Sequence, residues 1–202
     1  MVANWKMNVT SEKDAEGLFL SIRNVVAKLE YTKMICCPPH MYVNQVAQHV
    51  NHPNYRVGGQ DAYPEEAGSR TGETSVLMMK NAGAEYVILG HSERRHLETK
   101  ADVARKVTAV LEHEMTPIIC IGEEQRDRNW KKNLTTQLKD VFNRVPKKNP
   151  ENIIIAYEPI WAISGDKKNP ATATEYMEAL EVIKKELQKI CPSNKTNTMR
   201  NQ

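Results

Sequence analysis

Short runs of apolar residues alternate along this chain with longer stretches in which apolar residues recur every three or four positions. Continuous apolar runs are typical of strands buried on both faces, and the longer spacing is typical of helices that bury one face. The runs predict six strands, at residues 2–6, 33–37, 55–59, 86–90, 117–121 and 153–157. A helical stripe follows each run, so the pattern predicts a parallel sheet covered by helices.

Two of the helical stripes carry specific expectations. Ser11 and Asp14 form a capping pattern at the start of the first one, which predicts where that helix begins. Methionines occupy stripe positions in two later helices and are expected to fill the core, namely Met78, Met79 and Met177.

Composition narrows the class of protein. The chain has 202 residues, of which 40% are hydrophobic and 26% charged, and its net charge is +3. These values are typical of a globular domain and give no support to nucleic acid as a partner. No apolar run approaches the roughly 20 residues of a membrane span, and no leader precedes the first strand. The four cysteines lack metal-ligand spacing, so we expect a reduced, cytoplasmic protein without a metal.

The order of the elements limits the architecture. Six strand–helix units follow one another without a linker, which predicts one domain over residues 1–202. No G-x-G-x-x-G follows the first strand, so a dinucleotide-binding fold has no support. A doubly wound sheet and a (β/α) barrel both fit, and in both the chemistry is expected at the carboxyl ends of the strands.

The expected strand ends carry a short set of polar side chains: Asn4, Lys6, Gln60, Asp61, His91, Ser92, Glu93, Cys120 and Glu158. A cation, an imidazole and carboxylates at one edge suit proton transfer beside a carbonyl, with the cation holding an anionic substrate. Each has a plainer interpretation. Lys6 fits a solvated charge, His91 a core histidine and Cys120 a small buried apolar residue. Glu158 ends an apolar run, and a carboxylate in such a wall favours function.

Four motifs at these strand ends resemble signatures of the triosephosphate isomerase family. They are Asn-Trp-Lys-Met-Asn at 4–8, Gly-His-Ser-Glu-Arg-Arg at 90–95, Cys-Ile-Gly-Glu at 120–123 and Ala-Tyr-Glu-Pro-Ile-Trp-Ala-Ile at 156–163. Thr-Gly-Glu at 71–73 also resembles the family's dimer loop. The motifs stand in the family's order and near its spacing, over residues 2 to about 190.

The resemblance implies a (β/α)8 TIM barrel, with about six of its eight strand–helix units in this chain. It implies the interconversion of dihydroxyacetone phosphate and glyceraldehyde 3-phosphate in glycolysis and gluconeogenesis, without a cofactor. Glu158 would be the base that moves the carbon-bound proton, and His91 a neutral group that polarises the carbonyl. A backbone N–H is expected to donate to one ring nitrogen of His91. Lys6 would face the phosphate, Asn4 would hydrogen-bond the substrate, and the backbone of Ser164 could reach the phosphate.

The same resemblance assigns supporting positions. Residues around His91 and Lys6 would be Ser92, Glu93 and Cys120. A lid would extend over 159–170, including Pro159, Ile160, Trp161, Gly165, Asp166 and Lys167. A homodimer would form through the loop at 63–74, including Thr71, Gly72 and Glu73, with Arg70 either finding a carboxylate on the partner or staying in solvent.

The chain also departs from the family pattern. The lid reads Ser-Gly-Asp-Lys at 164–167 where the family usually has Gly-Thr-Gly-Lys, and Asp166 would slightly disfavour closure over a phosphate. A closed barrel of this class typically needs about 250 residues. We therefore expect a longer parent protein, and a 202-residue form with a weakened phosphate grip.

Two other functions stay open. One is a truncated, non-catalytic barrel that acts as a binding or assembly module. The other is a Schiff-base aldolase with Lys6 as nucleophile, which would require a desolvated lysine, whereas Glu93 and the substrate phosphate should keep Lys6 charged.

Overall fold

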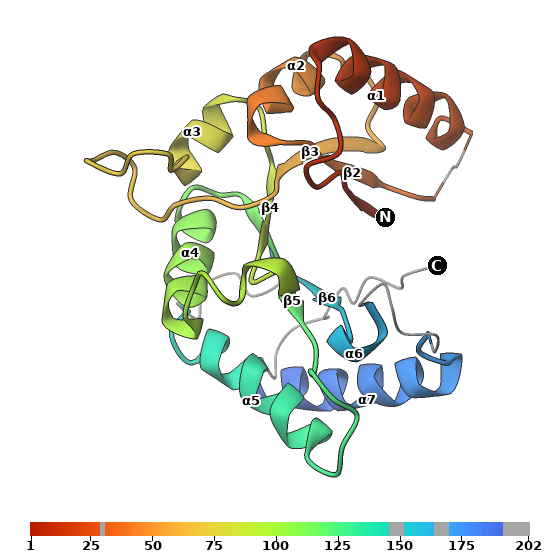
Figure 1. Ribbon diagram of the computed structural model, residues 1–202, viewed down its shortest axis with the longest axis vertical. Helices are drawn as coiled ribbons and strands as arrows, with labels where there is room; N and C mark the ends of the chain where they lie inside the picture. Colours follow the sequence, from red (N-terminus) through yellow and green to blue (C-terminus); the bar gives the residue numbers. More distant parts are fainter. Residues whose placement is uncertain (29–30, 146–151, 164–169, 192–202) are drawn as a thin grey trace. The chain divides into compact units, whose positions relative to one another are not determined.

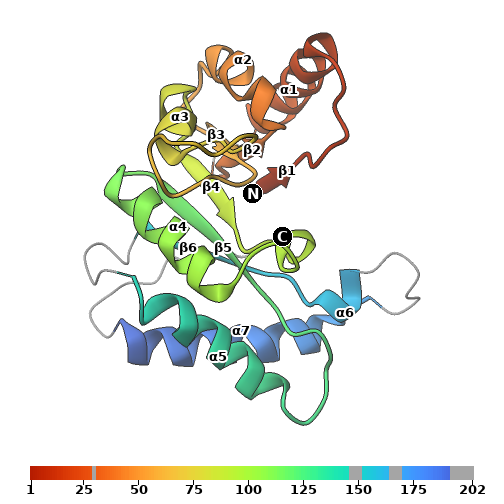
Figure 2. The same cartoon turned by 60° about the vertical axis from the view of Figure 1, so that its left-hand side comes forward.

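The computed structural model describes residues 1–28, 31–145, 152–163 and 170–191, which form two compact units. The first unit comprises residues 1–89 and 109–117, and the second comprises residues 90–108 and the described residues from 118 onward. Figures 1 and 2 show the elements of both units in two orientations.

The first unit contains four parallel strands that pair in chain order. They are β1 (Val2–Asn4), β2 (Met34–Cys37), β3 (Tyr55–Gly59) and β4 (Tyr86–Leu89). The connections contain α1 (Glu12–Val26), the 3-10 turn η1 (His40–Tyr42), α2 (Val43–Gln48) and α3 (Val76–Asn81). Phe19 of α1 packs its ring edge-on against Tyr55 of β3 at 5.8 Å between centroids, and both side chains are fully buried. Sheet and helix therefore share one apolar core, as the stripe of α1 requires.

The second unit is built around two parallel strands, β5 (Thr116–Ile121), whose first two residues belong to the first unit, and β6 (Ile154–Tyr157). Its other elements are the 3-10 turn η2 (Ser92–Arg94), most of α4 (Lys100–Glu112), α5 (Trp130–Phe142), α6 (Ile160–Ile163) and α7 (Ala173–Ile190). Helices α5 and α7 lie side by side in Figures 1 and 2. Both helices bury apolar residues, for example Leu134 and Leu138 of α5 and Ile183 and Leu187 of α7.

The strands and helices predicted from the apolar pattern are confirmed, with ends that move by a few residues. Ser11 caps α1 as expected, since its side chain accepts a hydrogen bond from the backbone N–H of Asp14 at 3.1 Å. The core role is confirmed for Met79 but wrong for Met78 and Met177, whose exposed fractions are 52% and 55%. A helix on the surface of a domain buries only one stripe of residues, and both methionines lie outside the buried stripe of their helix.

Candidate active site

His91 lies two residues after the end of β4, and its orientation depends on its neighbours in the chain. Gly90 has a φ of +68°, a left-handed conformation that glycine adopts without steric cost. His91 then caps η2, and its Nδ1 accepts a hydrogen bond from the backbone N–H of Glu93 at 3.2 Å. The expected backbone donor is thus confirmed. Since an accepting Nδ1 carries no proton, this geometry assigns the ring proton of neutral His91 to Nε2.

Glu158 lies directly after β6, and the structure brings it together with His91. Its backbone N–H donates to the carbonyl of Ile121 at 2.8 Å, which extends the β5–β6 ladder to this residue. The Oε1 atom lies 3.3 Å from Nε2 of His91, and the two side chains are 19% and 12% exposed. The other oxygen, Oε2, is buried and has no hydrogen-bond partner among the described residues. An unsatisfied buried carboxylate oxygen is unusual, which makes Glu158 a candidate functional residue.

Gly122 lies against the backbone of Glu158, and two side chains hold the Gly122 peptide by hydrogen bonds. The guanidinium of Arg95 donates to the Gly122 carbonyl at 2.8 Å. The amide of Gln137 clamps the same residue from α5, accepting from its N–H and donating to its carbonyl, both at 3.0 Å. A Cβ at position 122 would lie 2.5 Å from the carbonyl carbon of Glu158. The position of Glu158 therefore requires a glycine here and a fixed peptide around it.

Arg95 contributes charge as well as geometry. Burial lowers the pKa of its guanidinium, and the nearby Glu158 carboxylate acts in the opposite direction. Arginine stays charged in proteins even with such a shift. A permanent positive charge therefore interacts with the candidate base.

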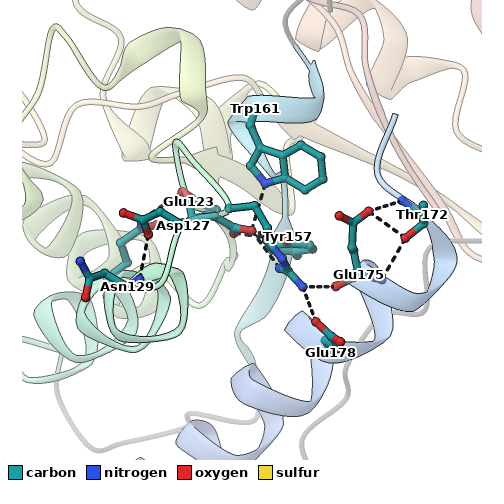
Figure 3. Close-up of polar contacts among 11 residues, drawn as sticks. Glu123, Asp127, Asn129, Tyr157, Trp161, Thr172, Glu175 and Glu178 are labelled. Atoms are coloured by element: carbon teal, nitrogen blue, oxygen red, sulfur yellow. Dashed lines mark hydrogen bonds and ion pairs between the residues drawn. The ribbon is translucent and has the colours of Figure 1, made fainter. Parts of the chain in front are cut away.

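A second carboxylate, Glu123, is fully buried and organises the segment around Glu158 (Figure 3). The Tyr157 hydroxyl donates to its two oxygens at 2.9 and 3.1 Å, and the Trp161 indole N–H donates to Oε1 at 3.1 Å. Arg126 provides the opposite charge at 3.0 Å. Burial raises the pKa of the Tyr157 phenol and the Glu123 carboxylate raises it further, so the phenol stays protonated and donates.

The first unit contains its own group of predicted residues at the ends of β1, β2 and β3. Lys6 has a φ of +52°, which is uncommon for a residue other than glycine. The side chain of Asn4 accepts from the Lys6 N–H at 3.0 Å, and Gln60 donates to the carbonyls of Lys6 and Cys37, both at 2.9 Å. These hydrogen bonds fix a strained backbone, which is typical of functional positions.

The other predicted residues near His91 differ in their surroundings. Cys120 is buried in β5, and Ser92 opens η2. The carboxylate of Glu93 is 59% exposed and lies 3.7 Å from Nδ1 of His91. Of the predicted lid, Pro159 is described and α6 contains Ile160 and Trp161. Its remaining predicted residues, Ser164, Gly165, Asp166 and Lys167, lie outside the described residues.

The predicted dimer loop is exposed at Thr71, Gly72 and Glu73. Arg70 is exposed, which is one of the two outcomes expected for it. Its guanidinium donates to the Tyr63 hydroxyl at 2.7 Å and lies 3.4 Å from the Glu65 carboxylate. Both groups are in the same loop, so the exposed cation also has partners close to it in the chain.

Several residues of the site were not assigned a role from the sequence, and the available signal differs among them. Gln137 lies within the apolar stripe of α5. A polar residue within such a stripe indicates a buried hydrogen bond. Glu123 and Arg95 stand inside quoted motifs, but their contacts join residues far apart in the chain. Arg126 lies in a charged loop whose pattern indicates only solvent exposure.

A cavity of about 630 Å³ lies within the second unit, with walls that include Arg95, Val103, Cys120 and Gln137. His91 and Glu158 are not among its lining residues, whereas Arg95 and Gln137, which hold Gly122, are. Among the residues that the structure describes, no three or more His, Cys, Asp and Glu side chains are grouped to hold a metal ion. Within the same ranges, no helix is long and apolar enough to cross a membrane.

These features define the class of protein: an α/β chain of sequential parallel strands, with a carboxylate and an imidazole 3.3 Å apart near strand ends. A family profile described as "Triosephosphate isomerase" matches residues 1–200. The chain belongs to the triosephosphate isomerase family. Its fold class is accordingly that family's (β/α)8 barrel, and the described residues contain six of the strands.

Bacterial relatives carry the same description. The "Triosephosphate isomerase" of Alkaliphilus oremlandii is 41% identical, over 83% of this chain and 68% of the relative. That of Rhodopirellula baltica is 38% identical, over 93% of this chain and 74% of the relative. That of Thermoanaerobacter pseudethanolicus is 33% identical, over 99% of this chain and 81% of the relative.

Proposed function

We propose that the protein interconverts dihydroxyacetone phosphate and glyceraldehyde 3-phosphate by proton transfer between neighbouring carbons. Glu158 removes the proton from one carbon and returns it to the other, through an enediolate. His91, with its proton on Nε2, donates a hydrogen bond to the substrate oxygens as negative charge develops on them. The substrate's own carbonyl accepts that charge, so the mechanism uses no cofactor.

One observation carries this proposal: the contact between Oε1 of Glu158 and Nε2 of His91 at 3.3 Å, beside a Glu158 oxygen that lacks a partner among the described residues. A base and a hydrogen-bond donor within a few ångströms can act on adjacent atoms of one small substrate. A non-catalytic binding module would not need this pair, and no feature of the described residues favours that alternative.

The remaining roles follow from the family. Lys6 supplies positive charge to the phosphate and Asn4 hydrogen-bonds the substrate, while the constrained backbone of Lys6 keeps that residue in a fixed conformation. The segment 159–170 acts as the lid, with the backbone of Ser164 reaching the phosphate. The single barrel domain over residues 1–202 is part of the same proposal.

We further propose a homodimer that forms through the exposed loop at 63–74. Thr71 would reach the partner subunit near its copies of Asn4 and Lys6, so that dimerisation orders the phosphate side of the site. Sedimentation at micromolar concentration should show a dimer. A fully active monomer would contradict the coupling between assembly and activity.

The isomerase proposal is tested by assaying the purified protein with dihydroxyacetone phosphate and following glyceraldehyde 3-phosphate with a coupled dehydrogenase. The protein should turn over, and His91→Gln should lower kcat by about 10²–10⁴-fold. The matched control is His96→Gln, because His96 is an exposed histidine five residues further along. Absence of turnover by the wild-type protein, or equal kcat in both variants, would contradict the proposal.

A further inference from the structure

Glu123 fastens the chain on both sides of Glu158. On one side, the Tyr157 hydroxyl donates to the Glu123 carboxylate at 2.9 and 3.1 Å. On the other side, the Ile160 N–H donates to the Glu123 carbonyl at 3.0 Å, and the Trp161 indole donates to the carboxylate at 3.1 Å. The location of the Glu158 backbone therefore depends on where Glu123 is held.

Arg126 holds Glu123 through an ion pair. Its Nη1 lies 3.0 Å from Oε1 of Glu123, while its Nη2 donates to the Glu175 carbonyl at 3.0 Å and to the Glu178 carboxylate at 2.8 Å. The guanidinium also lies over the Trp130 ring, 3.4 Å from the centroid. One side chain thus connects the buried carboxylate to the first residue of α5 and to α7.

The charges explain why this contact matters. Glu123 is fully buried, and Tyr157 and Trp161 are neutral donors. Among the described residues, Arg126 is the cation in ion-pair contact with Glu123. Removing one member of a buried ion pair leaves the other without compensation, and the carboxylate then moves toward water or takes up a proton. Either change weakens its hold on Tyr157 and Trp161.

We propose that Arg126 is a positioning residue for Glu158: by pairing with Glu123, it keeps the segment 157–161 in the place that sets the Glu158 carboxylate beside His91. Its effect on turnover rests on the isomerase function proposed above. Its effect on the segment 157–161 does not, because that effect follows from the contacts alone.

The geometry also explains why the residue is an arginine. The two terminal nitrogens of a guanidinium form a planar fork that reaches partners in two directions. A lysine at position 126 would keep the positive charge near Glu123. It would lose the simultaneous contacts to Glu175 and Glu178.

The first test measures the Trp161 indole without reference to activity. Hydrogen exchange of the indole N–H is followed by NMR in the wild-type protein, Arg126→Met and Arg126→Lys, with the signal assigned from Trp161→Phe. Arg126→Met should speed exchange at Trp161 by about tenfold or more, since a hydrogen bond to a charged group is lost or weakened. Arg126→Lys should give an intermediate rate.

Two references make this test specific. Arg128→Met is the matched control, because Arg128 is an exposed arginine two residues further along, and its exchange rate should stay within about twofold of wild type. The indole of Trp5, which belongs to the first unit, provides an internal reference in each sample.

The second test separates positioning from stability. In folded Arg126→Met, kcat should fall by about 10²-fold while KM stays within about threefold, because misplacing a reacting group by about 1 Å costs this much. Arg126→Lys should recover at least about a tenth of the wild-type kcat. Arg128→Met should leave both constants unchanged.

The outcomes are distinguishable. A folded Arg126→Met variant with wild-type exchange at Trp161 and wild-type kcat would overturn the proposal, even if it unfolds at a lower temperature. If Arg126→Met does not fold, Arg126→Lys decides, and an exchange rate equal to wild type would overturn the proposal. If the wild-type protein shows no turnover, the isomerase function fails, while the exchange measurement still decides whether Arg126 holds Trp161.

Discussion

Replacing Gly122 by alanine introduces a single methyl group at the closest backbone contact of the candidate site. The new Cβ would lie 2.5 Å from the Glu158 carbonyl carbon and 3.1 Å from the Pro159 nitrogen. Two carbons attract each other at about 3.5–4.0 Å, and the Glu158 carbonyl oxygen is closer to the new Cβ than the carbonyl carbon is, so the two segments must separate by at least about 1 Å. The contacting atoms belong to the backbone, so no side-chain rotation can relieve the overlap.

The surroundings resist this separation. On the Glu158 side, the Glu158 N–H donates to Ile121 at 2.8 Å. On the other side, Arg95 and Gln137 hold the Gly122 peptide at 2.8 and 3.0 Å. Overpacking of this kind typically costs about 1–3 kcal/mol of unfolding free energy, occasionally more. A displacement of about 1 Å at the base should also lower kcat by about 10²-fold.

The assay pairs denaturant unfolding with isomerase kinetics on Gly122→Ala and on a control, Gly17→Ala. Gly17 lies within α1, and no atom outside that helix's own backbone and its chain neighbours lies within 4 Å of a Cβ built there. Alanine at position 17 should therefore stabilise the protein by about 0.5–1 kcal/mol, since glycine disfavours a helix interior. If Gly122→Ala unfolds like wild type and keeps kcat within about threefold, the tight packing of Gly122 against Glu158 is wrong.

Three further predictions concern single groups. The ring nitrogens of His91 should show, by NMR at pH 7, a neutral imidazole with its proton on Nε2, and an imidazolium would contradict the assigned role. Glu98→Gln should lower the unfolding free energy by about 3–5 kcal/mol, because the Glu98 and Lys106 side chains form an ion pair at 2.5 Å and are only 5% and 7% exposed. A loss below about 1 kcal/mol would contradict a buried ion pair. Burial raises the pKa of the Cys36 thiol to about 12, so only about 10⁻⁴ of it is thiolate at pH 8. Cys36 in the folded protein should therefore react slowly with iodoacetamide. A reaction as fast as that of the denatured protein would contradict the burial.

The apolar pattern predicts most of the fold because the strands are buried on both faces and the helices on one. The predicted range 55–59 coincides with β3, and the capping pattern at Ser11 places the start of α1 correctly. Helix α6 was not predicted, since its four residues are too few to display a helical period. Met78 and Met177 show a second limit, because the pattern does not separate the buried stripe from the residues beside it.

The candidate site was predictable where its residues lie within two positions of a strand end, as His91 and Glu158 do, because parallel strands end at one edge. The supporting contacts were not predictable in the same way. The charge of the Glu123 carboxylate is neutralised by Arg126, which lies three residues further along in a polar loop. The same carboxylate accepts a hydrogen bond from Trp161, which lies 38 residues further along. Such pairings depend on the packing of α5 and α7, which the local sequence does not encode.

The most direct test of the account is the entry of deuterium from solvent into the carbon-bound positions of triose phosphate, measured in deuterium oxide with wild-type protein and with Glu158→Gln. Glu181→Gln serves as the control, since Glu181 is an exposed carboxylate on α7. The account predicts that the wild-type protein and the control catalyse this exchange, and that Glu158→Gln slows it by about 10²–10⁴-fold or more. Exchange by Glu158→Gln within about threefold of wild type would contradict the assignment of Glu158 as the base.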